Sequence, residues 1–357
     1  MDISKRADQT VGFEVEIQNL QLRDGKKENK ILLAESDEKI NEKPAFYFVT
    51  DGAGGAPTVY IEVVSAPMKT VEDVRDYIKT VRQICSIGKK SLPMPLPDYF
   101  GSVVSMQYTP ASSCYKITCP RPLINASNNH INLAVPFQTI GKSHFAETIL
   151  FDNESKDVRS NISKQPFRAA QKYANNYKPM GASDAIVSLL TLFFYQQIVL
   201  MNSKIFIKPY TAENPCENLS KTRFPVLFKV CKADIIKTVL SDEERLMLNN
   251  SAILAQIEKD LKSISTQVGT VRLPTDYIKN ATKVLSVNAT ESVPLYDELR
   301  LSGVIAPYKM AGVSDCYIVA EARTTKLNEQ MKDMFLNMKD NTVQAFVKAL
   351  KELFDRT

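Results

Sequence analysis

The sequence predicts one α+β domain in which helices pack on one side of a sheet. Strand-like alternation of apolar and polar residues dominates the N-terminal part of the chain, and helical spacing of apolar residues dominates much of the remainder. A strand-like segment returns near the C-terminus, at 315–324. Because strand-like segments occur at both ends of the chain, we expect residues distant in sequence to complete one sheet.

The composition is that of an ordinary globular protein. Of the 357 residues, 44% are hydrophobic and 24% are charged, proportions that exclude disordered and fibrous classes. The net charge is only +5, from 45 Lys and Arg residues against 40 Asp and Glu residues, which is too dilute to predict a nucleic-acid partner. The apolar run 185–201 is interrupted by polar residues and is short for a membrane span of about 20 residues, so we expect a core helix and no membrane partner.

Cysteine usage and the N-terminus both favour the cytoplasm. The six cysteines, at positions 85, 114, 119, 216, 231 and 316, include no CxxC pair, which favours reduced thiols. The first ten residues, MDISKRADQT, lack the apolar core of a cleaved signal peptide. We therefore expect a cytoplasmic protein; export by a route without a cleaved signal peptide stays open, as does the oligomeric state.

The expected strands follow from alternation and from β-branched and aromatic residues. They cover 11–20, 45–50, 58–65, 101–108, 114–119, 130–137, 204–208, 224–230 and 315–324. The second and third flank the turn-rich Asp51-Gly-Ala-Gly-Gly and are expected to form a hairpin. The stretch with Pro93, Pro95 and Pro97 is expected to be a loop, because it is too rich in proline for a helix or a central strand.

The expected helices follow from apolar residues that recur every three or four positions. They cover 70–88, 165–177, 183–201, 232–266 and 327–354. Gly88 is expected to end the first helix, and Ser241 with Glu244 matches a capping box that starts another. We expect a single domain over residues 1–357, with helical insertions at about 165–203 and 232–285.

Two glutamates share one face of the first expected strand. Glu14 and Glu16 alternate with Phe13, Val15 and Ile17, so their Cβ atoms lie about 7 Å apart on one face. This spacing lets two carboxylates reach adjacent metal ions. A solvent-facing polar face is the simpler interpretation of an isolated ExE motif, which also occurs in ADP-ribosyltransferases.

A carboxylate in an apolar strand and a histidine mark two further candidates. Glu62 lies between Ile61 and Val63, where its charge needs a cation, a hydrogen-bond donor or a metal unless the side chain points to water. His130 and Asn132 share the polar face of another strand. A lone strand histidine is either a ligand or a satisfied structural residue.

Charged residues of both signs occupy the last strands. Glu321 and Arg323 share one face of 315–324; the carboxylate suits a metal and the guanidinium a phosphate, or the two form a solvated pair. Arg223 and Lys229 lie at the ends of the apolar run between them and are further candidates for phosphate binding.

The ordered set of motifs resembles the carboxylate–amine ligases of the glutamine synthetase and glutamate–cysteine ligase superfamily, in particular the amidoligase-like branch. The matching stretches are Gly12-Phe-Glu-Val-Glu16, Ile61-Glu-Val-Val-Ser-Ala-Pro67, His130-Ile-Asn132 and Ala320-Glu-Ala-Arg323, which span nearly the whole chain. The family's second acidic position near the second stretch is either Asp51 or absent.

The resemblance implies a curved, mainly antiparallel sheet, like that of the glutamine synthetase catalytic domain, which holds Mg²⁺ under ATP. It implies amide formation between a carboxylate and an amine through an acyl phosphate, with substrates that are small molecules, peptides or proteins. The implied metal ligands are Glu14, Glu16, Glu62, His130 and Glu321. The implied catalytic and nucleotide-binding groups are Arg223, Lys229 and Arg323, with Asn132 also at the nucleotide.

Other classes stay open. A cysteine deamidase or hydrolase would pair His130 or His144 with a cysteine such as Cys114 or Cys119, and it would leave both the ExE and the ExR motifs unexplained. A non-catalytic binding or effector module would keep the fold without the metals, and ADP-ribosyl transfer would require NAD. Retained activity after replacement of every cysteine would exclude the first class, and binding of Mg·ATP would argue against the second.

Overall fold

The computed structural model describes most of the chain. The described residues are 2–4, 9–23, 30–52, 59–87, 91–118, 123–142, 158–202, 226–228, 232–268, 278, 282, 285, 315–322, 326–337 and 340–355. They belong to two compact units. The sheet unit is Met1–Ala134 with Glu321–Arg356, and the helical unit is Val135–Ala320 with Thr357. The chain therefore leaves the sheet unit after Ala134 and re-enters it at Glu321.

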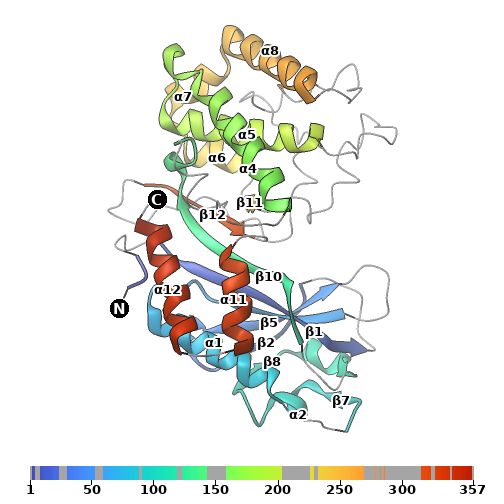
Figure 1. Ribbon diagram of the computed structural model, residues 1–357. Coiled ribbons are helices and arrows are strands. Elements are labelled where there is room, and N and C mark those ends of the chain that lie inside the picture. Colours follow the sequence, from blue (N-terminus) through green and yellow to red (C-terminus); the bar gives the residue numbers. More distant parts are fainter. Residues whose placement is uncertain are drawn as a thin grey trace. The chain divides into compact units, whose positions relative to one another are not determined.

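A large, mainly antiparallel sheet organises the sheet unit (Figure 1). Its strands are β1 (Val11–Arg23), β2 (Leu32–Ser36), β5 (Phe46–Gly52), β6 (Val59–Ser65), β7 (Met94–Pro95), β8 (Met106–Tyr108), β9 (Lys116–Ile117), β10 (Leu123–Pro136) and β12 (Tyr317–Ala322); β10 and β12 also contribute residues to the helical unit. The main path runs β12-β10-β1-β6-β5-β2-β8 and continues beyond β12 to β11 (Val226–Phe228), while β7 pairs with β9, which pairs with β1. A separate hairpin joins β3 (Lys39–Ile40) to β4 (Lys43–Pro44). The α+β class and the predicted β5–β6 hairpin are confirmed.

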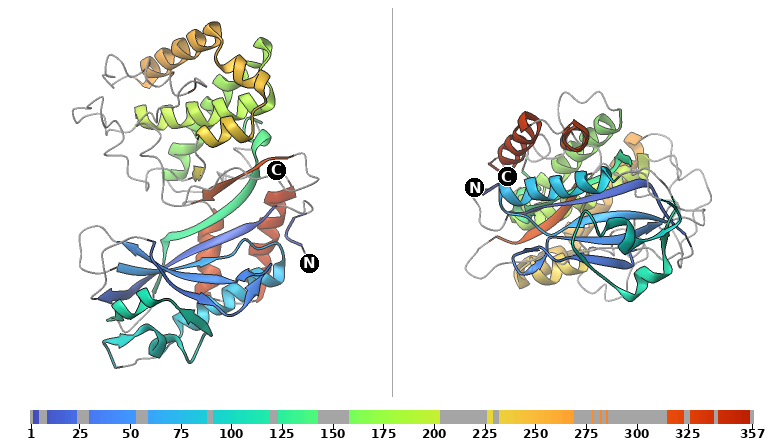
Figure 2. Two further views of the ribbon diagram at one scale, coloured as in Figure 1. Left: turned by 180° about the vertical axis from the view of Figure 1, so that it is seen from behind. Right: turned by 90° about the horizontal axis from the view of Figure 1, so that it is seen from below.

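Helices cover one face of this sheet, as the colours of α1, α11 and α12 make visible in Figure 2. These helices are α1 (Val71–Cys85), α11 (Lys326–Asn337) and α12 (Asp340–Asp355). Phe13 of β1 is fully buried and stacks on Tyr77 of α1 at 5.5 Å between ring centroids, and it packs against Phe346 of α12 at 5.9 Å. The Tyr77 hydroxyl also donates a hydrogen bond to the Val63 carbonyl of β6 at 2.8 Å. The apolar face predicted for the first strand is therefore the core of the sheet unit.

The helical unit is built around one apolar helix. Its described elements are α4 (Val158–Asn175), α5 (Asp184–Asn202), β11 (Val226–Phe228), α6 (Lys232–Thr238), α7 (Asp242–Leu248) and α8 (Ser251–Val268). Most described residues of α5 are buried, as its nearly continuous apolar composition predicts. The predicted capping box is confirmed at α7, where Ser241 and Glu244 exchange side-chain-to-backbone hydrogen bonds.

Three predictions about helices and loops need correction. The proline-rich stretch contains the short helix α2 (Leu96–Phe100), since proline is tolerated in the first turn of a helix, where no internal hydrogen bond needs its amide. The C-terminal stretch forms two helices, α11 and α12, where one was expected, and the expected helix 232–266 is divided into α6, α7 and α8. Helix α1 ends at Cys85, with the Ser86 amide bonded to the last-turn carbonyls, whereas the expected stop at Gly88 lies outside the described residues.

Two expected strands are shorter than predicted. Residues 101–103 form a turn after α2, in which the Gly101 amide donates to the Pro97 carbonyl, so only β8 is extended in 101–108. Cys114 ends a 3-10 helix (Pro110–Cys114), which leaves β9 as the strand in 114–119. The expected strand at 204–208 lies outside the described residues.

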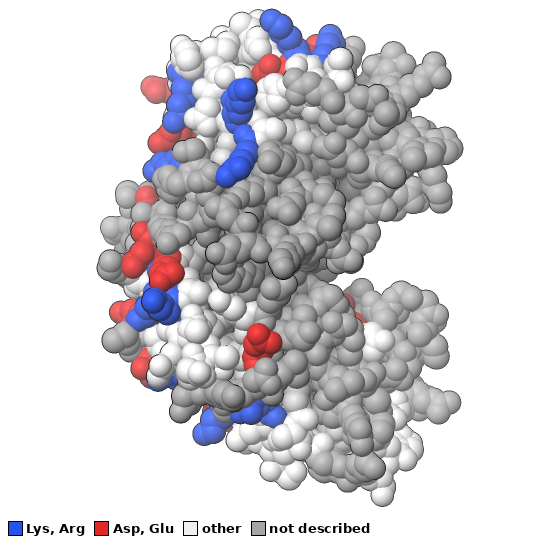
Figure 3. Space-filling view, viewed as in Figure 1, with Lys and Arg blue, Asp and Glu red and all other residues white. Residues whose placement is uncertain are grey.

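The distribution of charged side chains and the hydropathy of the helices both agree with the composition. On the face drawn in Figure 3, the Lys and Arg side chains of the described residues are interspersed with Asp and Glu side chains. Among the helices that the structure describes, none combines the length and apolar character needed to cross a membrane.

Candidate functional site

Strand pairing places the predicted acidic residues on the face of the sheet opposite the helices. In β1, Glu14 lies directly across from His130 of β10, and Glu16 lies directly across from Glu62 of β6. Directly paired residues project from the same face of a sheet. Because Phe13 points to the helices, its neighbours in β1 must point away from them. The motifs of three strands therefore share one surface.

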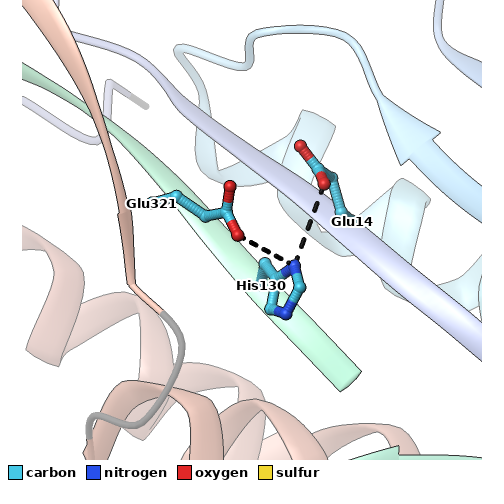
Figure 4. A group of neighbouring side chains, drawn as sticks. All are labelled: Glu14, His130 and Glu321. Atoms are coloured by element: carbon cyan, nitrogen blue, oxygen red, sulfur yellow. Dashed lines mark ion pairs between the residues drawn. The ribbon is translucent and has the colours of Figure 1, made fainter. Parts of the chain in front are cut away.

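Three of the predicted ligands meet at close range (Figure 4). His130 Nδ1 lies 3.1 Å from Glu321 Oε1 and 3.9 Å from Glu14 Oε2. One potential ligand atom from each of the three residues lies within 4.8 Å of those of the other two. Glu321 is only 2% exposed, so its carboxylate is largely removed from water. Two carboxylates and an imidazole thus converge from strands β1, β10 and β12.

Asn132 orients one member of this group. Its side-chain amide donates a hydrogen bond to Glu14 Oε1 at 2.9 Å, while Glu14 Oε2 faces His130. Asn132 pairs with Gly12 across β1 and β10, so it stands two residues along β10 from His130 on the same face. The amide holds the Glu14 carboxylate with one oxygen directed at the imidazole.

Glu62 forms the second part of the site. It is 2% exposed, and its Oε2 forms an ion pair with the Lys30 ammonium. Burial and the neighbouring Glu14 raise the pKa of Glu62 to about 8 and outweigh the attraction of Lys30. Burial alone would lower the pKa of Lys30, but the carboxylates of Glu62 and Glu14 raise it overall. Asp51 of β5 contributes to both shifts and so belongs to the same electrostatic surroundings.

The carboxylate cluster has the chemistry of a divalent-cation site. Oxygen ligands with an occasional imidazole suit Mg²⁺ and Mn²⁺. Adjacent ligand atoms of an octahedral Mg²⁺ lie about 3 Å apart, given bonds of about 2.1 Å, and the 3.1 Å between His130 Nδ1 and Glu321 Oε1 matches that spacing. His130 Nδ1 is buried, and its contacts among the described residues are the ion pairs with Glu321 and Glu14, which could share a cation with it. The side chains of Glu14, His130 and Glu321 therefore fit a divalent cation such as the Mg²⁺ that the family resemblance implies.

The predicted phosphate-binding residues are not tested by this geometry. Arg223, Lys229 and Arg323 lie outside the described residues, as do His144 and Cys119. Asn132 and all five predicted metal ligands are described, and all six project from one face of the sheet.

Of the described cysteines, Cys85 is unsuited to act as a nucleophile. Cys85 lies in α1, on the opposite side of the sheet from His130, and burial raises the pKa of its thiol to about 12. Cys114 is exposed at the end of a 3-10 helix, and Cys316 is buried. Within the part of the chain that the structure describes, the group of potential ligands around His130 contains glutamates and no cysteine.

Lys30 also belongs to this site, although no pattern in the sequence singles it out. It stands just before β2, in a strongly charged segment, and no local pattern separates it from the other lysines there. Its position depends on hydrogen bonds to β5: its amide donates to the Thr50 carbonyl at 2.7 Å, and the Ile31 amide donates to Thr50 Oγ1 at 3.0 Å. These contacts join residues far apart in sequence and could not be read from spacing.

No protein-family model and no curated protein matches the chain. Two solved structures are similar to it. One is the ACD domain of a VgrG toxin of Vibrio cholerae, a glutamate-to-glutamine mutant in complex with ADP and Mn²⁺, with 14% sequence identity and a TM-score of 0.55 over 91% of this chain and 96% of that chain. The other is a Vibrio cholerae toxin from the MARTX/VgrG family, with 14% identity and a TM-score of 0.52 over 91% and 95% of the two chains. At this level of identity the comparison establishes a shared fold.

Proposed function

We propose that this protein is an ATP- and Mg²⁺-dependent ligase that joins a carboxylate to an amine through an acyl phosphate. The observation that carries the proposal is the convergence of Glu14, His130 and Glu321 from three strands, with Glu62 beside them. A similar fold that binds ADP and Mn²⁺ supports a nucleotide and a divalent cation as the ligands.

The residues divide by chemistry. Glu14, Glu16, Glu62, His130 and Glu321 would hold the divalent cations, which neutralise charge on the nucleotide phosphates. Asn132 orients Glu14 through its hydrogen bond. Arg223, Lys229 and Arg323 would bind the phosphates of the nucleotide and the transferring phosphoryl group, because guanidinium and ammonium groups match phosphate oxygens.

The proposed reaction has two steps. A substrate carboxylate oxygen attacks the γ-phosphorus of ATP, and ADP leaves. The amine nitrogen then attacks the acyl carbon, phosphate departs with the C–O bond electrons, and the nitrogen loses a proton to give the amide. Neither step needs a protein nucleophile, because positioning and charge neutralisation supply most of the acceleration in phosphoryl transfer.

Both units would be parts of one catalytic domain, residues 1–357, with helical insertions at about 165–203 and 232–285. The acid and the amine are small molecules or side chains of a peptide or protein. In the protein case, the product would be an amide between an acidic side chain and a lysine.

The test is ADP release from Mg·ATP in the presence of a panel of acids and amines. Hydroxylamine in place of the amine should trap the acyl phosphate as a hydroxamate. Joined protein substrates should appear as covalent oligomers on a denaturing gel. Glu42→Gln removes the charge of an exposed glutamate beside β4 and should leave the rate of ADP release unchanged. If no acid stimulates ADP release and Mg·ATP does not bind in calorimetry, the ligase proposal is wrong.

A further inference from the structure

Lys30 places a permanent cation inside the proposed metal site. Its backbone is anchored to β5 by the hydrogen bonds at Thr50, and it adopts a left-handed conformation with φ of 61°, which is uncommon for a residue other than glycine. This conformation is unfavourable for a residue with a Cβ atom, so the surrounding contacts must hold it. The chain thereby directs a lysine side chain to Glu62 from a fixed point beside β5.

The ammonium occupies the place that a cation held by Glu62 would take. Lys30 Nζ contacts Glu62 Oε2 directly, and the charges of Glu14 and Asp51 act on the same ammonium. A metal ion bound by Glu62 would lie within a few ångströms of this nitrogen. Two such cations repel each other strongly in a site that is largely shielded from water.

The Lys30 side chain can also move away from Glu62 into solvent. About a third of it (34%) is exposed, whereas its partner carboxylate is almost fully buried. An ammonium on a flexible four-carbon stem can therefore move into solvent without disturbing the core. Glu62 has no comparable freedom, because its strand is paired on both sides, with β1 and with β5.

We propose that Lys30 is a built-in counter-cation of the acidic site, which holds Glu62 in the metal-free protein and is displaced when a divalent cation binds there. This inference rests on the proposed function, because it takes Glu62 as a metal ligand. It adds that Lys30 weakens the binding of a metal ion that arrives without a nucleotide. The nucleotide phosphates, which offer the displaced ammonium another anion, would favour entry of metal together with nucleotide.

The main experiment measures Mn²⁺ binding to the metal-free protein by calorimetry, without and with ATP. Lys30→Met should bind Mn²⁺ about tenfold more tightly than the wild type when no nucleotide is present, and ATP should improve its Mn²⁺ affinity less. The metal-free variant should melt at a lower temperature, because Glu62 loses its partner. Lys43→Met, which removes the same charge from the exposed β3–β4 hairpin, should change neither quantity.

A second measurement uses the wild type and does not depend on folding of a variant. The rate at which an amine-reactive acetylating reagent modifies Lys30, followed by peptide mass spectrometry, should rise several-fold on addition of Mn²⁺, while the rate at Lys43 stays constant. Mn²⁺ binding to Lys30→Met that equals or falls below that of the wild type, or a Lys30 rate that Mn²⁺ leaves unchanged, would overturn the inference. If the wild type binds Mn²⁺ in neither the presence nor the absence of ATP and Lys30→Met also fails to bind it, the proposed function fails as well.

Discussion

The two units each bury carboxylates, and they stabilise them in different ways. In the helical unit, Asp260 of α8 accepts a hydrogen bond from the Tyr177 hydroxyl at 2.8 Å on one oxygen and from the Gln256 amide at 3.0 Å on the other. In the sheet unit, Glu62 pairs with a lysine yet lies beside Glu14. Neutral donors matched to each oxygen indicate a structural contact, whereas carboxylates that face one another store repulsion that a bound cation would relieve.

The largest expected effect is on activity, at Glu14. Replacement by glutamine keeps the shape and an acceptor for Asn132 but removes a charged ligand, so ATP turnover should fall by about 10³-fold, in the range seen when a group that stabilises developing charge is lost. The melting temperature of the metal-free protein should stay constant or rise, because one of several neighbouring negative charges is gone. Steady-state ADP release and thermal denaturation in EDTA measure the two effects. A large loss of stability would mark Glu14 as a structural residue like Asp260.

Substitution of Phe13, which precedes Glu14, should mainly reduce stability, whereas substitution of Glu14 should mainly reduce activity. Phe13→Ala removes a ring that packs against both α1 and α12, and it should lower the free energy of unfolding by about 3 to 5 kcal/mol. Denaturant titration followed by circular dichroism measures it. Comparable stability of Phe13→Ala and the wild type would show that this face is not the core that the structure describes.

The stability of the protein should depend on the hydrogen bond from the Tyr177 hydroxyl to Asp260. Tyr177→Phe leaves one oxygen of the buried Asp260 without its hydroxyl donor, and it should cost about 1 to 3 kcal/mol of unfolding free energy. Tyr173→Phe is the matched control, because its hydroxyl lies 3.4 Å from Ser263 Oγ in a half-buried contact and should matter less. Equal losses in the two variants would remove the contrast between the units.

The pH dependence of stability should separate the two kinds of site. Because the pKa of Glu62 is raised to about 8 in the folded protein, the folded state binds a proton more tightly than the unfolded state between the ordinary value of 4.5 and about 8. Stability of the metal-free protein should therefore fall as pH rises through this range, by at most about 1.4 kcal/mol per pH unit for one group. Glu62→Gln should flatten the slope in denaturant titrations at several pH values. A wild-type slope that Glu62→Gln leaves unchanged would assign the effect to another group.

Local patterns predicted the parts of the fold in which one face is buried. The alternation around Phe13 and the helical spacing of 70–88 both reflect burial on one side, and both elements are present as β1 and α1. The patterns failed where a general preference was too coarse. Proline disfavours helix interiors but not first turns, so α2 was missed. An apolar stripe continued across the end of α11, so two helices were predicted as one.

The candidate site was predictable to the extent that residue type and strand phase determine it. Glu14, Glu62, His130 and Glu321 were identified because each interrupts or alternates with an apolar strand pattern. Lys30 carries no such signal, since its place depends on the pairing of residues 30–31 with Thr50. Sequence spacing also could not show that Glu16 opposes Glu62, because cross-strand register is a property of the folded sheet.

The site residues are spread along the sequence from Glu14 to Glu321, and folding alone brings them together. Ligand binding is therefore linked to folding. An unfolded chain has no means of presenting these groups together, so a cation would bind the native state alone. Occupancy would then raise the melting temperature in proportion to the logarithm of ligand concentration once the site is near saturation. Thermal denaturation across a series of metal ions would therefore rank their affinities before any substrate is known.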